Sequence, residues 1–172
     1  MRLTLAIFIF LLNGLFAEKL TFPSALKDAL PYTGPHNPGV NTKTLDGKIM
    51  CGYQGWFNAE GDGADNNWRH YGNRNFGPGN CTIEYWPDLS EFTESETFPT
   101  PFKHADGSTA KLFSSHKQQT VERHFKWMKD YGIDGVFLQR FGVSVRSPKG
   151  LKNRNKVTAN VQAGANKHGR TW

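Results

Sequence analysis

Apolar residues recur with a helical period in one segment of the second half of the chain. Val121, Phe125 and Met128 are spaced four and three residues apart, and Trp127 and Tyr131 widen the same apolar stripe. This spacing predicts an amphipathic helix that packs one face against a core.

Flanking residues predict where the helices begin and end. Thr120 suits the N-cap of this helix, Glu122 would lie in its positively polarised first turn, and Gly132 suits the position just past its end. A second helix is predicted over residues 155–167, with small apolar residues on one face and Gly169 as its stop.

Shorter apolar runs predict strands. Residues 48–53 suit a short strand, and residues 135–139 form a continuous apolar run, typical of a strand buried on both faces of a parallel sheet. Residues 83–86 predict another extended segment, and residues 170–172 resemble the opening of a further strand. The turn sequence Asp106-Gly107, between two short apolar segments, indicates a hairpin.

The order of these elements predicts an α/β fold. Helix, glycine, buried strand, loop and helix is the rhythm of successive βα units, and we expect about three of them. An eight-unit TIM barrel needs roughly 250 residues, whereas the chain has 172. We therefore expect a partial (β/α)8 barrel, the N-terminal part of a larger one, over residues 45–172, after an irregular lead at residues 18–44. A small complete α/β domain is the alternative.

The first 17 residues have the pattern of a secretory signal peptide. Arg2 supplies the positive charge, residues 3–12 are apolar except for Thr4, and residues 15–17 suit a cleavage site. A buried N-terminal helix is the alternative. No other run approaches the roughly 20 apolar residues of a membrane-spanning helix. We therefore expect a secreted protein with no membrane partner.

Positive charge is concentrated near the end of the chain. The formal net charge is +6, and residues 140–172 contain eight Lys or Arg and no Asp or Glu. Such a basic segment raises the possibility of nucleic-acid binding. We favour a solvated helix face, because export removes the usual nucleic-acid partner, and we expect none.

The two cysteines and one sequon lie close together in the sequence. Cys51 and Cys81 could pair in a secreted protein, and the loop so closed would stabilise the fold by about 3 kcal/mol. Alternatively, Cys51 is a small apolar residue within a strand. Asn80 begins an Asn-Cys-Thr sequon, which makes it a possible N-glycosylation site on the surface.

The ends of the predicted strands carry the candidate binding residues. In a βα barrel, reactive groups gather at the carboxyl ends of the strands. This rule selects Tyr53, Gln54, Trp56, Trp86, Asp88, Gln139 and Arg140. Aromatic rings stack on sugar faces while amide, carboxylate and guanidinium groups bind hydroxyls, so the set suits a carbohydrate; packing against loops is the alternative. We expect Trp56 and Arg140 to share one surface, unless Arg140 pairs with Asp88 or Glu60.

Several motifs carry a resemblance to a known family. They are residues 50–57, 60–63, 86–88, 113–115, 124–137 and 139–141. Together they resemble the N-terminal part of the glycoside hydrolase family 71/99-like proteins, which are secreted and lie near the endo-alpha-mannosidases and alpha-glucanases in fold. The resemblance covers about residues 45–172 and implies a TIM barrel and a sugar substrate.

A catalytic pair is not evident in the sequence. Glycosidases use two carboxyl groups, and no Asp or Glu follows Asp134, which we expect to be structural. We therefore expect a secreted glycoside hydrolase-like protein that acts on or binds oligo- or polysaccharide, an enzyme at the level of the family but inactive as this chain, with catalytic residues unknown. A non-catalytic secreted carbohydrate-binding protein is the alternative. We expect no cofactor and no metal, since Asp62 and Asp65 suit loop turns better than calcium ligation.

Overall fold

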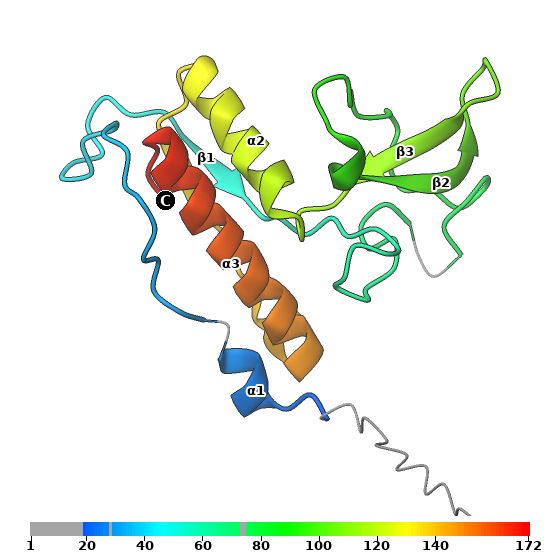
Figure 1. Cartoon of the computed structure of the whole chain (residues 1–172), viewed down its shortest axis with the longest axis horizontal. Coiled ribbons are helices and arrows are strands. Elements are labelled where there is room, and N and C mark those ends of the chain that lie inside the picture. Colours follow the sequence, from blue (N-terminus) through cyan, green and yellow to red (C-terminus); the bar gives the residue numbers. More distant parts are fainter. Residues whose placement is uncertain (1–18, 28, 73–74) are drawn as a thin grey trace, which may run out of the picture.

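Two small sheets and three α-helices are arranged in two parts (Figure 1). The computed structural model describes residues 19–27, 29–72 and 75–172. Within these residues the elements in chain order are α1 (Phe22–Leu26), β1 (Met50–Tyr53), η1 (Glu94–Glu96), β2 (Thr97–Lys103), β3 (Thr109–Phe113), α2 (Gln118–Asp130), β4 (Gly135–Leu138), η2 (Gly142–Val145) and α3 (Pro148–His168). The predicted signal peptide at residues 1–17 lies outside the described part of the chain.

The predicted TIM barrel is wrong. β1 and β4 form one parallel pair, and β2 and β3 form a separate antiparallel pair, so the described residues contain no barrel-like arrangement. The physical reason lies between β1 and β4, where the chain forms a hairpin that pairs with itself instead of adding a parallel strand. Residues 83–86, predicted to be extended, form no strand there.

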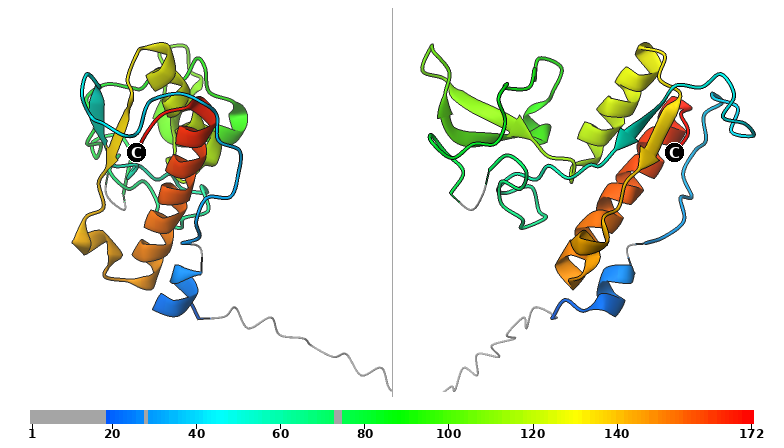
Figure 2. Two further views of the ribbon diagram at one scale, coloured as in Figure 1. Left: turned by 90° about the vertical axis from the view of Figure 1, so that its left-hand side faces the viewer. Right: turned by 180° about the vertical axis from the view of Figure 1, so that it is seen from behind.

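The parallel pair is covered on one face by α2 and α3, as Figure 2 shows from behind. Val136 in β4 is fully buried against both helices, and the partly buried Cys51 and Tyr53 of β1 pack on the same core. The side chain of Phe137, on the other face of β4, is 55% exposed. The prediction that this strand is buried on both faces is therefore wrong, although the strand itself and its parallel pairing are confirmed.

The apolar stripes of α2 and α3 build the core of this part. The buried residues that pack together are Val121, Phe125, Met128, Val136, Val157, Val161 and Ala165. Gly164 lies where α3 crosses α2, because a methyl group there would come within 2.8 Å of Phe125 Cδ2. The helical period read from the sequence is thus confirmed, and both stripes face the same sheet. Tyr131, predicted to widen the stripe, is instead 81% exposed at the end of α2.

The helix starts differ from those predicted. Lys117, not Thr120, is the N-cap of α2, and Thr120 lies buried inside the helix. α3 begins at Pro148, well before residue 155, with the Ser147 hydroxyl accepting a hydrogen bond from the Gly150 amide. It ends as predicted, because Gly169 adopts the left-handed conformation, with φ of 61°.

A second core lies under the hairpin. Strands β2 and β3 and the loop after β1 enclose buried Ala59, Trp68, Tyr71, Phe76 and Leu112. The predicted turn at Asp106-Gly107 is confirmed, since Gly107 has φ of 85° and joins the two strands. After α3, Thr171 forms a single parallel bridge to Gly135, on the side of β4 away from β1. No helix in the described residues is long and apolar enough to cross a membrane.

Candidate functional site

A cavity lies at the carboxyl ends of the two parallel strands. Its volume is about 510 Å³. The residues that line it are Gly52, Tyr53, Gln54, Gly55, Trp56, Phe57, Phe113, Ser115, His124 and Gln139. Because parallel strands end at the same edge of a sheet, residues that are distant in sequence meet here. We call this space the Trp56 cavity.

Two glutamines cross from one strand end to the other. Gln54 Nε2 donates to Gln139 Oε1 at 2.7 Å. Gln139 extends over Gly52, where a methyl group would lie 3.5 Å from its Nε2. Both amides keep unpaired donors and acceptors towards the cavity, since an amide carries two donors and an acceptor with two lone pairs. This pair can therefore bind hydroxyl groups of a ligand.

Tyr53 and His124 form the inner wall of the cavity. The Tyr53 hydroxyl lies 2.8 Å from His124 Nδ1, so β1 is joined to α2 at this point. Burial raises the pKa of Tyr53 and lowers the pKa of His124 to about 4. Both groups are therefore neutral at pH 7, and one donates to the other.

Trp56 is part of an aromatic stack. Its ring lies nearly parallel to His70, with centroids 4.2 Å apart, and nearly parallel to Phe141, with centroids 5.7 Å apart. Phe141 is 45% exposed and extends the aromatic surface outwards from the end of β4. His70 has φ of 66°, a backbone conformation uncommon for residues other than glycine. Trp56 lines the cavity, whereas His70 and Phe141 do not. An aromatic ring such as that of Trp56 is suited to contact with a sugar ring.

Four of the seven predicted binding residues meet at this cavity, and three do not. Trp86 Nε1 donates to the Lys111 carbonyl at 2.7 Å and supports the hairpin. Asp88 is exposed and lines a neighbouring cavity of about 550 Å³, which shares Phe113 and His124 with the first. Arg140 Nη2 donates to Asn155 Oδ1 at 2.7 Å, about two turns into α3.

The predicted partnership of Trp56 and Arg140 is met only in part. Both residues follow the carboxyl ends of the parallel strands, and Trp56 stacks on the neighbour of Arg140, Phe141. The Arg140 side chain, however, binds α3 and is not among the lining residues. The alternative ion pairs with Asp88 or Glu60 are not formed either.

A buried polar network beside the cavity was not predicted. The Asp62 carboxylate accepts from Ser114 Oγ at 2.6 Å and from Asn58 Nδ2 at 2.9 Å, as well as from two backbone amides. Asn58 Oδ1 in turn accepts from Asn153 of α3 at 3.2 Å. The network fixes the loop after Phe57 to both the hairpin and α3. The Gly- and Asp-rich sequence of this loop indicates turns but not these long-range contacts.

The buried Arg154 was also missed. Its side chain is almost fully enclosed, and Nη1 donates to the carbonyls of Gln54 and Gly55 at 3.4 and 3.3 Å. Both acceptors belong to the wall of the Trp56 cavity. The sequence gives one indirect signal, because Arg154 belongs to the acid-free stretch that begins at Arg140.

The remaining candidate features are dispersed. Cys51 in β1 and Cys81 in an exposed loop are both free thiols, so the possible disulfide is not formed. Asn80 is half-buried, and its Nδ2 donates to the Asn75 carbonyl at 2.9 Å. No group of three or more His, Cys, Asp or Glu in the part of the chain described here could hold a metal ion.

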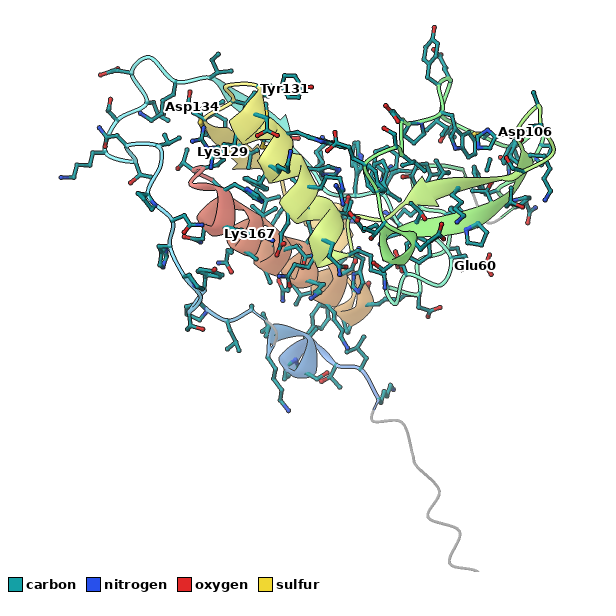
Figure 3. The ribbon with its side chains drawn as sticks, turned by 45° about the horizontal axis from the view of Figure 1, so that its top comes forward. Glu60, Asp106, Lys129, Tyr131, Asp134 and Lys167 are labelled. Carbon is teal, nitrogen blue, oxygen red and sulfur yellow. The ribbon has the colours of Figure 1, made fainter. Side chains whose placement is uncertain are left out.

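Carboxylates are likewise scattered. Figure 3 shows Glu60 and Asp106 on the hairpin side and Asp134 at the far end of α2. Asp134 Oδ2 accepts from the Ile49 amide at 2.8 Å, a structural contact at the amino-terminal ends of the parallel strands.

Comparisons with family models, curated proteins and solved structures gave no match to this chain.

Proposed function

We propose that this chain is a secreted, non-catalytic carbohydrate-binding protein that holds an oligosaccharide in the Trp56 cavity. The observation that carries the proposal is the meeting of Tyr53, Gln54, Trp56 and Gln139 around one cavity. Stacked rings and paired amides are the groups that bind sugar faces and hydroxyls. The motifs that resemble family 71/99-like hydrolases include these residues, and we propose that the chain derives its ligand class from that relationship.

Binding without hydrolysis is favoured by the lining of the cavity. A glycosidase needs two carboxyl groups about 5 to 10 Å apart, and none of the ten lining residues is Asp or Glu. Asp62 is buried and already accepts four hydrogen bonds. Asp88 lies in the neighbouring cavity and binds the Ser90 amide. Tyr53 and His124 supply no carboxyl group, and each is within hydrogen-bond distance of the other.

Titration of the chain with a panel of neutral and acidic oligosaccharides tests the proposal. Trp56→Ala and Gln139→Ala should each weaken binding of a positive ligand about tenfold or more, equivalent to about 1.4 kcal/mol. Tyr85→Ala is the matched control, because Tyr85 is an aromatic residue that is 86% exposed and outside the cavity. Near-ultraviolet circular dichroism would verify that each variant folds.

Three outcomes would overturn the proposal. Binding that Trp56→Ala leaves unchanged would place the ligand elsewhere, and absence of binding across the panel would remove the carbohydrate altogether. Turnover of an alpha-linked oligosaccharide by the chain would instead contradict its non-catalytic character. Export is tested separately, by fusing residues 1–17 to a reporter and measuring its appearance in the medium.

A further inference from the structure

A second cavity lies between the segment that precedes the hairpin and the second half of α2. Its volume is about 550 Å³, within the range of about 300 to 1,000 Å³ of sites for small molecules. Aromatic rings and carboxylates line it together, from Asp88, Glu91, Phe92, Trp127 and Tyr131 among others. We call this space the Trp127 cavity.

Two aromatic rings of the Trp127 cavity are accessible to a ligand. Tyr131 is 81% exposed just past the end of α2 (Figure 3), and Trp127 is half-buried. Phe92, by contrast, already stacks on Phe113 with centroids 5.6 Å apart, and Arg123 Cζ lies 5.3 Å from its ring centroid. The faces of Trp and Tyr rings attract cations, because the ring quadrupole is negative there. Trp127 and Tyr131 therefore suit a positively charged ligand.

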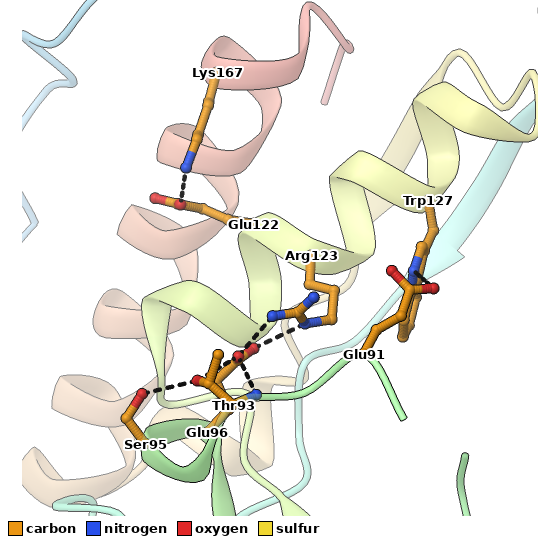
Figure 4. Close-up of polar contacts among 8 residues, drawn as sticks. All are labelled: Glu91, Thr93, Ser95, Glu96, Glu122, Arg123, Trp127 and Lys167. Atoms are coloured by element: carbon orange, nitrogen blue, oxygen red, sulfur yellow. Dashed lines mark hydrogen bonds and ion pairs between the residues drawn. The ribbon is translucent and has the colours of Figure 1, made fainter. Parts of the chain in front are cut away.

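Two carboxylates line the same cavity and are held in place. Asp88 Oδ1 accepts from the Ser90 amide at 2.9 Å, and Glu91 Oε1 accepts from Trp127 Nε1 at 3.0 Å (Figure 4). Within the described part of the chain, neither carboxylate forms an ion pair with Lys, Arg or His. Their negative charge is thus available to a ligand that enters the cavity.

Positive charge is missing from the lining of the Trp127 cavity. None of the nine lining residues that the structure describes is Lys or Arg. His124 also lines the cavity and is neutral at pH 7, since burial lowers its pKa to about 4. Arg123, beside Phe92, donates through Nε and Nη2 to Glu96, whose charge compensates its own. The cavity is therefore negative, although the chain as a whole has a net charge of +6.

We propose that the Trp127 cavity binds the quaternary ammonium group of a small ligand, as choline carries. The inference is independent of the proposed function, because Trp56 does not line this cavity. The rings would contact the N-methyl groups, and the carboxylates would supply the opposite charge. A quaternary ammonium has no N–H to donate, so it would leave the hydrogen bonds of Asp88 and Glu91 to Ser90 and Trp127 in place.

Titration of the full chain with choline and with 3,3-dimethylbutan-1-ol tests the inference. The two molecules have nearly the same shape, but only choline is charged. We expect choline to bind about tenfold or more tightly than the alcohol. Choline should also shift the indole N–H resonance of Trp127, which is identified as the one missing from the NMR spectrum of Trp127→Phe.

Substitutions at the rim of the cavity separate the ring from the charge. Tyr131→Ala and Glu91→Gln should each weaken choline binding about threefold or more. Glutamine keeps an oxygen that can accept from the Trp127 indole, so the second change removes only the charge. Tyr85→Ala and Glu60→Gln are the matched controls, because both residues are exposed and lie outside the cavity. Both control variants should bind choline as the wild type does.

Three outcomes would overturn the inference. They are the absence of choline binding, equal affinity for choline and the neutral alcohol, and effects of the control variants as large as those of Tyr131→Ala and Glu91→Gln. Trp56→Ala distinguishes failure of this inference from failure of the proposed function, since it should weaken oligosaccharide binding and leave choline binding unchanged. Loss of choline binding in Trp56→Ala would place the cation in the other cavity and would also overturn the inference.

Vesicles distinguish two sources of the ammonium group. The chain would be mixed with vesicles of phosphatidylcholine and, separately, of phosphatidylglycerol. Binding only to phosphatidylcholine vesicles, with release by free choline, would support the inference with a lipid headgroup as the ligand. Binding of choline without binding of either vesicle would support it with a free ligand.

Discussion

The Tyr53 hydroxyl and the His124 ring, 71 residues apart, lie 2.8 Å from each other at the inner wall of the Trp56 cavity. The contact joins the last residue of β1 to the middle of α2. The two rings also meet edge to face, with centroids 5.9 Å apart. Since burial lowers the pKa of His124 to about 4, the neutral imidazole is part of the folded state at pH 7.

Stability should fall as the solution becomes acidic because of His124. An unfolded histidine has a pKa of about 6.5, so the unfolded chain binds a proton here before the folded chain does. The stabilisation is complete above pH 6.5 and is lost as the pH falls towards about 4. We expect a loss of about 2 kcal/mol between pH 7 and pH 5 from this residue. Urea unfolding at each pH measures it.

His124→Gln isolates the effect, because His70, His116 and His168 also have lowered pKa values and act in the same direction. The variant should show a shallower dependence on pH than the wild-type chain. His104→Gln, a change in the exposed hairpin turn, should retain the wild-type slope. If the free energy of unfolding depends on pH in the same way in His124→Gln and in the wild type, His124 is not the source of the loss of stability in acid.

The ion pair of Glu96 and Arg123 should be the main polar link between the hairpin and α2 (Figure 4). Glu96 is fully buried and accepts from Arg123 Nε at 3.1 Å and Nη2 at 2.7 Å. Removing one partner leaves the other buried and unpaired, so we expect Arg123→Met to lower the free energy of unfolding by about 3 kcal/mol. Chemical denaturation at pH 7 measures this loss.

Glu94 provides a comparison two residues away. It pairs with Lys111, but its side chain is 88% exposed, so Glu94→Gln should cost less than about 1 kcal/mol. The double variant Glu96→Gln/Arg123→Met should recover part of the loss, since it leaves no unpaired charge. If Arg123→Met lowers the free energy of unfolding no more than Glu94→Gln does, the buried ion pair contributes no more to stability than the exposed one.

Asp62→Asn should destabilise the chain by about 2 kcal/mol. The Asp62 carboxylate accepts from two side chains and two backbone amides, whereas an asparagine would turn one acceptor into a donor facing other donors. Thermal unfolding measures the change. Glu60→Gln, at an exposed position on the same loop, should stay within about 0.5 kcal/mol of wild type. Equal effects of the two variants would show that the network contributes little.

Gly55→Ala should be poorly tolerated. Gly55 has φ of 51°, and a methyl group there would lie 2.5 Å from Val157 Cγ1. Backbone strain and overpacking together should cost about 3 kcal/mol. Gly61→Ala controls for strain alone, because Gly61 has φ of 82° with no atom near the added methyl group, and should cost about 1 kcal/mol. If both variants lose the same stability, the contact with Val157 has no effect.

Local patterns in the sequence predicted most elements and the hairpin, but not that the parallel sheet would contain only two strands. The period of α2 and the apolar runs of β1 and β4 were sufficient to find those elements, because their side chains face a core. The first half of α3 was missed because the residues it buries are polar, Asn153 and Arg154 among them. Ser147 and Pro148 could have located its start.

The barrel was mispredicted because alternating apolar residues do not specify a backbone partner. Ile83 and Trp86 pack on the second core without joining a strand. The expectation that binding groups gather at the carboxyl ends of parallel strands nevertheless placed Gln54 and Gln139 together correctly. It requires only two parallel strands that end at one edge of a sheet. Asp62 and its partners depend on loop geometry, which no local period encodes.

The separation of the two apolar cores has a consequence for how the chain opens. One core joins α2, α3 and the parallel strands, and the other lies under the hairpin. Glu96, Arg123 and the Asp62 network connect the two parts through polar bonds. Native-state hydrogen exchange should therefore resolve two cooperative units, with hairpin amides exchanging through a partial opening that leaves α2 and α3 protected. The Trp56 cavity lies on the boundary between these units, so a bound ligand would slow exchange in both.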